Sequence, residues 1–298
     1  MSSWAGGQQA QIFEGGFRPY VGTRLAPKRC FRSLYTYSLG RLLGRKRRFR
    51  SKLIGIAAFF VAWIGAIVQI FLAGLFSEIG DLGFDTVREY YTQVGVGVVL
   101  FTVLATPMLL NTDRRSGLLS LYLASPLSRR SYLNAQTSAI FSLLIAMSLV
   151  PVLVLGIVYT SLGSGPGHAG DFFIFVLRTV TAALALAAVP TALAVAVCSL
   201  VRRTGMAIVV IALCLLVPAG ITALLIEQVG VAGEIAVLDP LRMSRALTKR
   251  SHGLALTDGS PGTLDAVATW VVVLANLAWV AVLSGIAHWR YGRMEVER

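Results

Sequence analysis

Residues 113–133 read DRRSGLLSLYLASPLSRRSYL and join two long apolar segments, at about 100–112 and 137–159. The stretch is patterned rather than uniformly polar, because an apolar block over 118–123 is flanked by two pairs of arginines, Arg114 with Arg115 and Arg129 with Arg130. Pro126 disfavours helical geometry in the residue before it, so a helix in this stretch ends there. The pattern predicts a short amphipathic helix at a membrane face, with arginines that reach phosphate head groups or an acidic protein surface.

The composition places this stretch in an integral membrane protein. Of the 298 residues, 56% are hydrophobic and 14% are charged, and the mean hydropathy is +0.72, whereas about 25% of the residues in a soluble domain are charged. Six apolar segments approach the roughly 20 residues that a helix needs to cross the hydrocarbon core. They lie at about 53–76, 92–112, 136–160, 172–200, 205–227 and 266–289. We therefore predict an all-α integral membrane protein with six transmembrane helices.

The distribution of charge predicts the orientation in the membrane. With the N-terminus inside, 21 of the 27 Lys and Arg residues fall on the inner side. Ten of the 14 Asp and Glu residues fall on the outer side or at its helix ends. This asymmetry predicts that both termini are cytoplasmic. The net charge of +13 is concentrated in residues 1–52 and beside apolar segments, which argues against a nucleic-acid partner.

The residues before the first predicted span divide into two parts. Residues 1–28 are expected to form a flexible cytoplasmic arm, with no signal peptide. Residues 29–52 are expected to form a basic amphipathic helix along the inner leaflet, followed by a six-helix domain over 53–290 and a cytoplasmic tail over 291–298. The apolar residues of the basic helix recur at helical spacing: Phe31, Leu34, Tyr35, Leu39 and Leu42. A basic anchor that only fixes the topology is an equal alternative.

Few polar residues interrupt the predicted spans. Gln69 and Asn276 carry amides that need a partner in hydrocarbon, so they either bond a neighbouring helix or line a pathway. No Asp or Glu lies in the middle of a span, which argues against a proton- or sodium-coupled transporter with a carboxylate relay. The segment at 228–265 lies outside, where half-helices could dip into the outer leaflet.

The sequence lacks the residue patterns of a catalytic centre. It contains no G-x-x-x-x-G-K-[ST] loop to cradle phosphates, and its three cysteines and three histidines are scattered without metal-ligand spacing. We therefore expect that this chain is not an enzyme and that it binds no cofactor.

The stretch at 113–130 resembles the loop between the second and third membrane helices of ABC-2-type transporter permeases. In that family an acidic residue and an arginine are followed by Gly-Thr-Leu-Glu and then by Ser/Thr-Pro-Leu/Val-Ser-Arg. Leu118 and Ser120 stand where Thr and Glu are usual, which blurs the subfamily more than the family. Because the family's loop contacts the ATP-binding subunit, the resemblance assigns coupling to Asp113, Arg114, Arg115, Gly117, Leu119, Leu123, Ser125, Pro126, Leu127, Ser128, Arg129 and Arg130.

Two further stretches are similar to the same family. The basic helix at 29–52 resembles its connecting helix, which also borders the ATPase. Asp239, Pro240 and Arg245 match a proline-containing stretch before the last helix. In the family that region supplies extracytosolic half-helices that close the outer end of the pathway. A plain surface loop is the alternative for this stretch.

The resemblance implies the permease subunit of an ATP-binding cassette exporter in the cell membrane. Its implied partners are an ATPase subunit that holds ATP and Mg, a second permease copy (the same chain or a related one) and membrane lipids. The substrate is not readable from the sequence. Two alternatives stay open: a membrane-embedded lipid-modifying enzyme, and a non-transporting membrane scaffold or sensor partner.

Overall fold

The structure consists of helices joined by turns. It is a computed structural model that describes residues 26–44, 49–76, 85–116, 127–163, 165–228, 237–253 and 267–293. No strand occurs in these ranges, which confirms the all-α part of the predicted fold class. The helices are α1 (Pro27–Leu42), α2 (Phe49–Phe76), α3 (Asp85–Arg115), α5 (Arg129–Ser161), α6 (Ala169–Leu200), α7 (Thr204–Gln228), α8 (Pro240–Ser251) and α9 (Thr269–Gly292).

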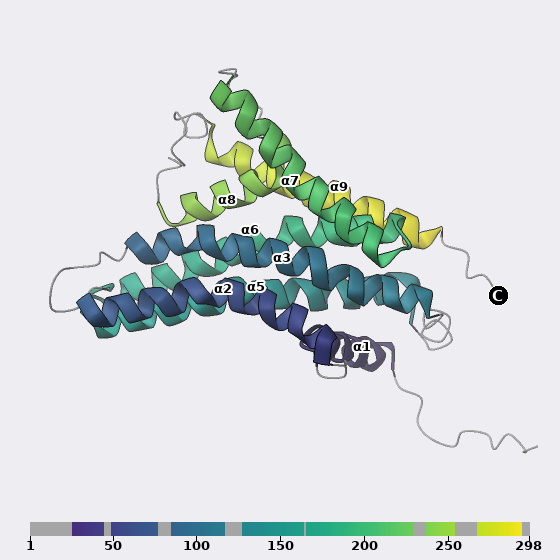
Figure 1. Ribbon diagram of the computed structural model, residues 1–298, viewed down its shortest axis with the longest axis horizontal. Helices are drawn as coiled ribbons and strands as arrows, with labels where there is room; N and C mark the ends of the chain where they lie inside the picture. The colour runs from purple at the N-terminus through teal and green to yellow at the C-terminus, as the bar shows by residue number, and fades with distance from the viewer. Residues whose placement is uncertain are drawn as a thin grey trace, which may run out of the picture.

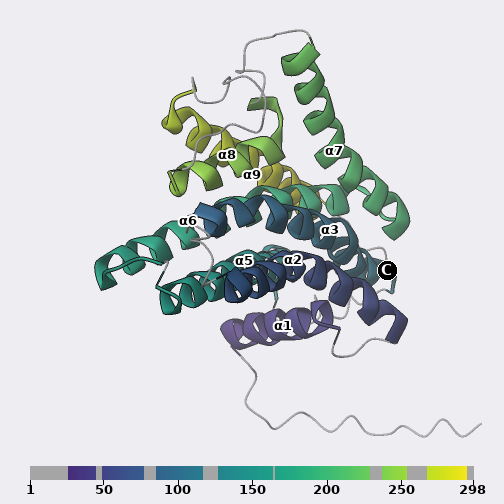
Figure 2. The same ribbon diagram turned by 60° about the vertical axis from the view of Figure 1, so that its left-hand side comes forward.

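The helices are stacked in layers (Figures 1 and 2). The long helices α2, α3, α5 and α6 run alongside one another in the middle, α7, α8 and α9 cover one side, and α1 lies against the other side. Helix α6 contacts α3, α5, α7, α8 and α9. Its residues 189–199 are buried on every face, so α6 forms the centre of the packing.

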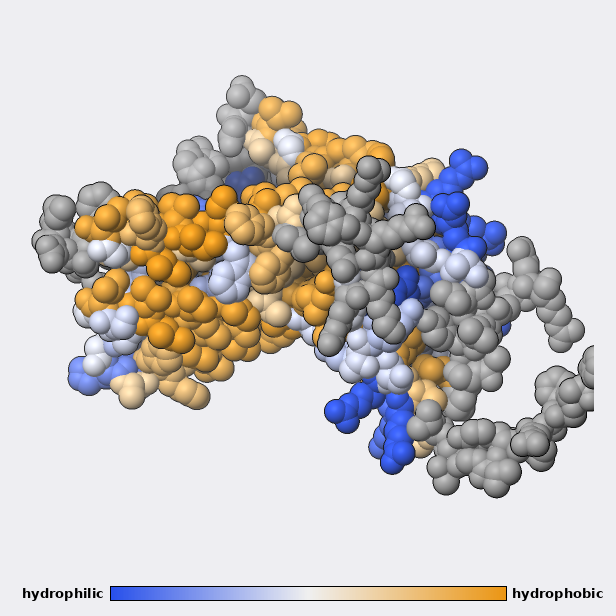
Figure 3. Space-filling model, turned by 60° about the horizontal axis from the view of Figure 1, so that its bottom comes forward, coloured by the Kyte–Doolittle hydropathy of each residue, from blue (hydrophilic) through white to orange (hydrophobic). Residues whose placement is uncertain are grey.

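Within the described residues, five helical stretches are long and apolar enough to cross a membrane: Gln93–Arg115, Arg129–Ser161, Ala169–Leu200, Thr204–Leu225 and Thr269–Gly292. Within α2, the apolar stretch Phe59–Leu75 is shorter. Apolar side chains cover much of the coloured surface in Figure 3, with most of the strongly hydrophilic ones toward the right-hand end and a smaller group at the lower left. These features agree with a multi-pass membrane protein, and the sixth span and the orientation of the termini stay predictions.

Helices α2 and α3 approach each other closely. A Cβ atom added to Gly97 would lie 2.6 Å from the Cβ of Ala62 and 2.8 Å from its Cα. The Tyr90 hydroxyl of α3 donates a hydrogen bond to the carbonyl oxygen of Ala62. Only a residue without a side chain fits at position 97, because backbone atoms of α2 cannot move aside as the tip of a flexible side chain can.

Helix α1 is shorter than the sequence suggested. The basic amphipathic helix was predicted over 29–52, but α1 ends at Leu42 and α2 begins at Phe49. Gly44 follows with φ of 74°, a left-handed conformation that glycine adopts readily and that ends helices. Residues 45–48 lie outside the described part of the chain. The described helix α1 therefore ends before the basic run at 45–48.

Candidate coupling site at the α1 end of the bundle

A buried carboxylate lies where α1, α3 and α5 meet. Asp113, near the end of α3, is fully buried and accepts three hydrogen bonds. The Arg41 guanidinium of α1 forms an ion pair with its Oδ1 atom. The Tyr132 hydroxyl and the Gln136 amide of α5 donate to its Oδ2 atom at 3.0 and 3.1 Å. We call Arg41, Asp113, Tyr132 and Gln136 the Asp113 cluster.

The Asp113 cluster is a stable arrangement only while it is complete. A charge buried away from water is costly unless a counter-charge and hydrogen bonds compensate it. Asp113 has both, with the Arg41 side chain 10% exposed and its own side chain 0% exposed. Because the compensating groups come from α1 and α5, the cluster fixes both helices to the end of α3.

A second set of contacts ties the end of α3 to α6 and α9. The Arg114 guanidinium donates to the carbonyl oxygens of Cys198 and Ser199 at 2.7 and 3.2 Å. These carbonyls belong to the last turn of α6, where a cation also meets the negative end of the helix dipole. The guanidinium lies 5.8 Å from the ring centre of Tyr291 in α9. That ring is 6.5 Å from the ring of Tyr132, so the two sets adjoin.

The start of α5 carries the other described part of the predicted coupling stretch. The Ser128 hydroxyl caps the helix by accepting a hydrogen bond from the Ser131 N–H at 3.1 Å. Leu127 is buried, and Arg129 donates to the Gly292 carbonyl of α9 at 3.3 Å. Arg130 is exposed, as is Arg115 at the end of α3.

The predicted coupling residues therefore fall into three groups. Asp113, Arg114, Leu127, Ser128 and Arg129 make their described contacts inside the chain. Arg115 and Arg130 are exposed beside them. The remaining five lie outside the described residues, together with the amphipathic helix predicted at 118–123: Gly117, Leu119, Leu123, Ser125 and Pro126. The structure brings together the two ends of the predicted coupling stretch at 113–130.

The predicted apolar face of the connecting helix packs on the bundle. Leu34 and Leu42 are buried, and Phe31, Tyr35 and Leu39 are partly buried against the core. The Tyr35 hydroxyl donates to the Ser142 hydroxyl of α5 at 3.0 Å. The basic residues Lys28, Arg29 and Arg32 on the rest of α1 are exposed. Helix α1 thus presents its apolar side and the buried Arg41 to the protein, and turns Lys28, Arg29 and Arg32 outward.

The other predicted site residues lie away from this end. Gln69 is half-buried in α2. Asn276 of α9 is buried, accepts a hydrogen bond from the Ser244 hydroxyl of α8 at 3.0 Å and donates to the Val272 carbonyl at 3.0 Å. Asn276 therefore makes an interhelical contact.

The stretch before the last helix forms a capped helix. Asp239 precedes α8 and accepts hydrogen bonds from the backbone N–H groups of Leu241 and Arg242 at 2.9 and 3.1 Å. Pro240 occupies the first turn, where its missing N–H costs nothing. Arg245 is partly buried in α8 and faces α3 near Gly95. Burial raises the pKa of Asp239, although the N–H donors and the nearby arginines oppose the shift.

The sequence interpretation missed the partners of Asp113. Arg41 was treated as one of many basic residues of the amphipathic helix, although it alone reaches a buried acid among the described residues. Tyr132 and Gln136 are four residues apart on α5 and so share one face. Their shared face, on the helix that follows the stretch beginning at Asp113, is the signal that could have identified them.

The described residues contain no group of three or more His, Cys, Asp or Glu side chains that could hold a metal ion. The family model described as ABC-2 family transporter protein matches residues 46–296 of this chain. That range covers every described helix except α1. No curated protein matches the chain.

Proposed function

Since the chain belongs to the ABC-2 family of transporter proteins, we propose that it is the permease subunit of an ATP-binding cassette exporter, driven by a separate ATPase subunit. The Asp113 cluster is the observation that supports coupling of this chain to an ATPase. It links α1 to both helices that flank the 117–126 stretch. Helix α1 and the 117–126 stretch are the two elements that the resemblance places against an ATPase.

The contacts at this end support a mechanical role. A partner that moves the 117–126 stretch acts on α3 and α5 directly, because the stretch joins them. Arg41 carries the displacement to α1, and Arg114 carries it to the end of α6. Packed cores and buried ion pairs move between discrete arrangements rather than deforming continuously. The α1 end therefore moves as one unit and redirects the spans between inward- and outward-facing states.

The exposed charges at this end suit an acidic partner surface and an anionic leaflet. Arg115 and Arg130 flank the predicted coupling helix, and α1 turns Lys28, Arg29 and Arg32 outward. Such rim charges mainly steer association, while buried apolar side chains supply most of the affinity. In this proposal Leu119 and Leu123 fill a groove on the ATPase, and Asp113 positions the helix that holds them.

The same proposal includes the topology and the partners. The excess of Lys and Arg on the α1 side makes this side and both termini cytoplasmic, with six spans in the cell membrane. ATP and Mg bind to the partner, because the sequence contains no phosphate-cradling loop. A second permease copy completes the pathway.

Purification from native membranes tests the proposal. The tagged chain, extracted in mild detergent, should carry a P-loop ATPase, and the complex should hydrolyse ATP with inhibition by vanadate. The chain stripped of that partner should hydrolyse none. If a homogeneous preparation of this chain alone hydrolyses ATP robustly, or if no ATPase accompanies it under conditions that keep other exporters intact, the proposal is wrong.

A further inference from the structure

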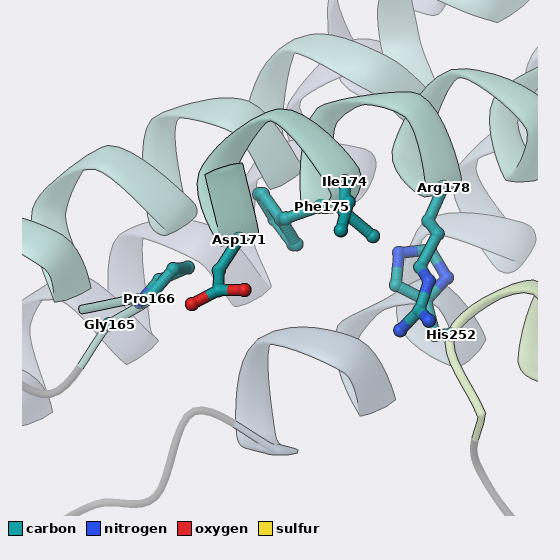
Figure 4. A pocket seen from close by; sticks show the side chains of 7 residues that line it. All are labelled: Gly165, Pro166, Asp171, Ile174, Phe175, Arg178 and His252. Atoms are coloured by element: carbon teal, nitrogen blue, oxygen red, sulfur yellow. The ribbon is translucent and has the colours of Figure 1, made fainter. Parts of the chain in front are cut away.

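A pocket lies at the end of the bundle away from the Asp113 cluster. It has a volume of about 320 Å³ and is formed by the start of α6, the turn at Gly165 and Pro166, and the residue after α8, His252. Its residues are shown in Figure 4. Ligand sites for small molecules begin at roughly this size, about 300 Å³. None of its residues takes part in the proposed coupling.

Two opposite charges line this pocket without meeting. Asp171 and Arg178 both belong to α6, seven residues apart, which corresponds to two helical turns or about 10.5 Å along the axis. Figure 4 shows the Asp171 carboxylate on one side and the Arg178 guanidinium beside His252 on the other. Asp171 lies 3.7 Å from the His168 imidazole, with both side chains largely exposed. Among the described residues Arg178 forms no ion pair.

The wall between the two charges is apolar and rigid. Ile174 and Phe175 supply it. The Phe175 ring is buried against α5, where a Cβ atom on Gly156 would lie 2.4 Å from it. The same ring meets the His252 imidazole edge-on with 6.2 Å between centres. The Nδ1 atom of His252 is 3.2 Å from the Thr248 carbonyl oxygen, to which it donates, so the imidazole is held in place.

Arg178 is an exposed cation on an apolar stretch of α6. It lies more than two turns inside an apolar helix, next to Leu177 and near Phe173, which are 55% and 68% exposed. A cation in such surroundings is costly unless it reaches water or pairs with an anion. Asp171 is fixed two turns away on the same rigid helix. The complementary ligand therefore carries both charges.

We propose that this pocket binds a zwitterionic ligand, with an ammonium group at Asp171 and a phosphate or carboxylate group at Arg178 beside His252. An arginine fork binds such acidic groups through two parallel hydrogen bonds. Two sources supply this chemistry: the head group of an aminophospholipid, and a small soluble zwitterion. The site stands independently of the permease proposal, because the binding needs neither ATP nor a partner.

Direct binding to the purified full chain in detergent tests the site. The soluble arm uses O-phosphoethanolamine in titration calorimetry. The lipid arm uses short-chain phosphatidylethanolamine, with phosphatidylglycerol of the same chain length as the anionic comparison, followed by native mass spectrometry. Binding in the soluble arm assigns a small zwitterion, and binding in the lipid arm alone assigns a head group. Either result supports the proposal, and no binding in both arms overturns it.

Charge-removing variants identify the residues. Arg178→Gln should weaken binding of the bound probe at least about tenfold, because a hydrogen bond to a charged group is lost. Asp171→Asn should abolish the preference for phosphatidylethanolamine over phosphatidylglycerol. Arg203→Gln is the matched control, since Arg203 is exposed at the opposite end of α6, and it should bind as the unaltered chain does. If Arg178→Gln and Asp171→Asn also bind as the unaltered chain does, at equal helix content, the pocket is not the site.

Discussion

Replacing Arg41 by methionine should destabilise the protein through the charge it leaves behind. Methionine replaces the aliphatic part of the arginine side chain and removes the guanidinium, so Asp113 stays buried without its counter-charge. Both side chains are almost fully inside the protein, 10% and 0% exposed, so solvent screens the pair little. Breaking a buried pair by removing one partner costs about 3–5 kcal/mol. Asp113 keeps the donors Tyr132 and Gln136, so we expect the lower end, about 3 kcal/mol.

A double-mutant cycle separates this effect from lost packing. Asp113→Asn removes the buried charge at nearly constant volume and should cost about 2 kcal/mol. In the Arg41→Met background the same change removes the uncompensated charge. The double variant should therefore be more stable than the sum of the two predicts, by about 2 kcal/mol. Equilibrium unfolding in mixed micelles of dodecyl maltoside and sodium dodecyl sulfate measures each free energy.

Arg32→Met is the matched control, because Arg32 is an exposed arginine on the same helix. Surface substitutions of this kind usually change stability by less than about 0.5 kcal/mol. If Arg41→Met is no more costly than this control, or if the effects of Arg41→Met and Asp113→Asn simply add, the Asp113 cluster does not hold α1 to the bundle.

Three further predictions address other parts of the chain. Gly97→Ala should cost about 1–3 kcal/mol in the same unfolding assay, because the new Cβ meets the Ala62 backbone. Gly74→Ala should not destabilise the protein, because nothing lies within 4 Å of a Cβ atom added there. Leu119→Asp or Leu123→Asp should detach the ATPase or uncouple its hydrolysis at normal membrane expression, and Arg129→Ala should do less; full copurified activity in both aspartate variants would refute the coupling role. Burial raises the pKa of Asp239 above 3.8, so its carboxyl group binds a proton more tightly in the folded state than in the unfolded state. The stability that this protonation contributes is present below pH 3.8 and is lost as the pH rises through the raised pKa. Asp239→Asn should remove that slope from the unfolding free energy, and an unchanged slope would rule out Asp239 as its source.

The sequence was sufficient to predict an all-α fold, because the long helices are apolar runs and α1 is an amphipathic repeat. The apolar face of α1 could be read directly, since its other face is charged. The central position of α6 could not be predicted from the sequence. A membrane helix is apolar toward both lipid and protein, so nothing in residues 189–199 marks them as buried on every face. The end of α1 was misplaced because the basic residues after Gly44 are compatible with a helix.

The sequence identified the candidate stretch but not its contacts. The predicted stretch contains Asp113, yet its ion-pair partner Arg41 is 72 residues away and Gln136 is 23 residues away. One sequence gives no information on which of many arginines meets a given acid. Asp113 and Arg114 looked like surface charges because they border a loop, and the structure gives them internal partners from α1, α5 and α6. The helical spacing of apolar residues is visible in the sequence. Burial at the end of a helix is not, because it depends on which other elements pack there.

The central claim, that an ATPase docks at the α1 end, is tested most directly by site-specific photo-crosslinking in intact membranes. A benzophenone amino acid is placed at Ser116, which is exposed at the end of α3, or at Gly167, which is exposed at the opposite end with nothing within 4 Å of an added Cβ. The account predicts a crosslink from position 116 to a P-loop ATPase and none from position 167. A crosslink to the ATPase from position 167 and none from position 116 would contradict it.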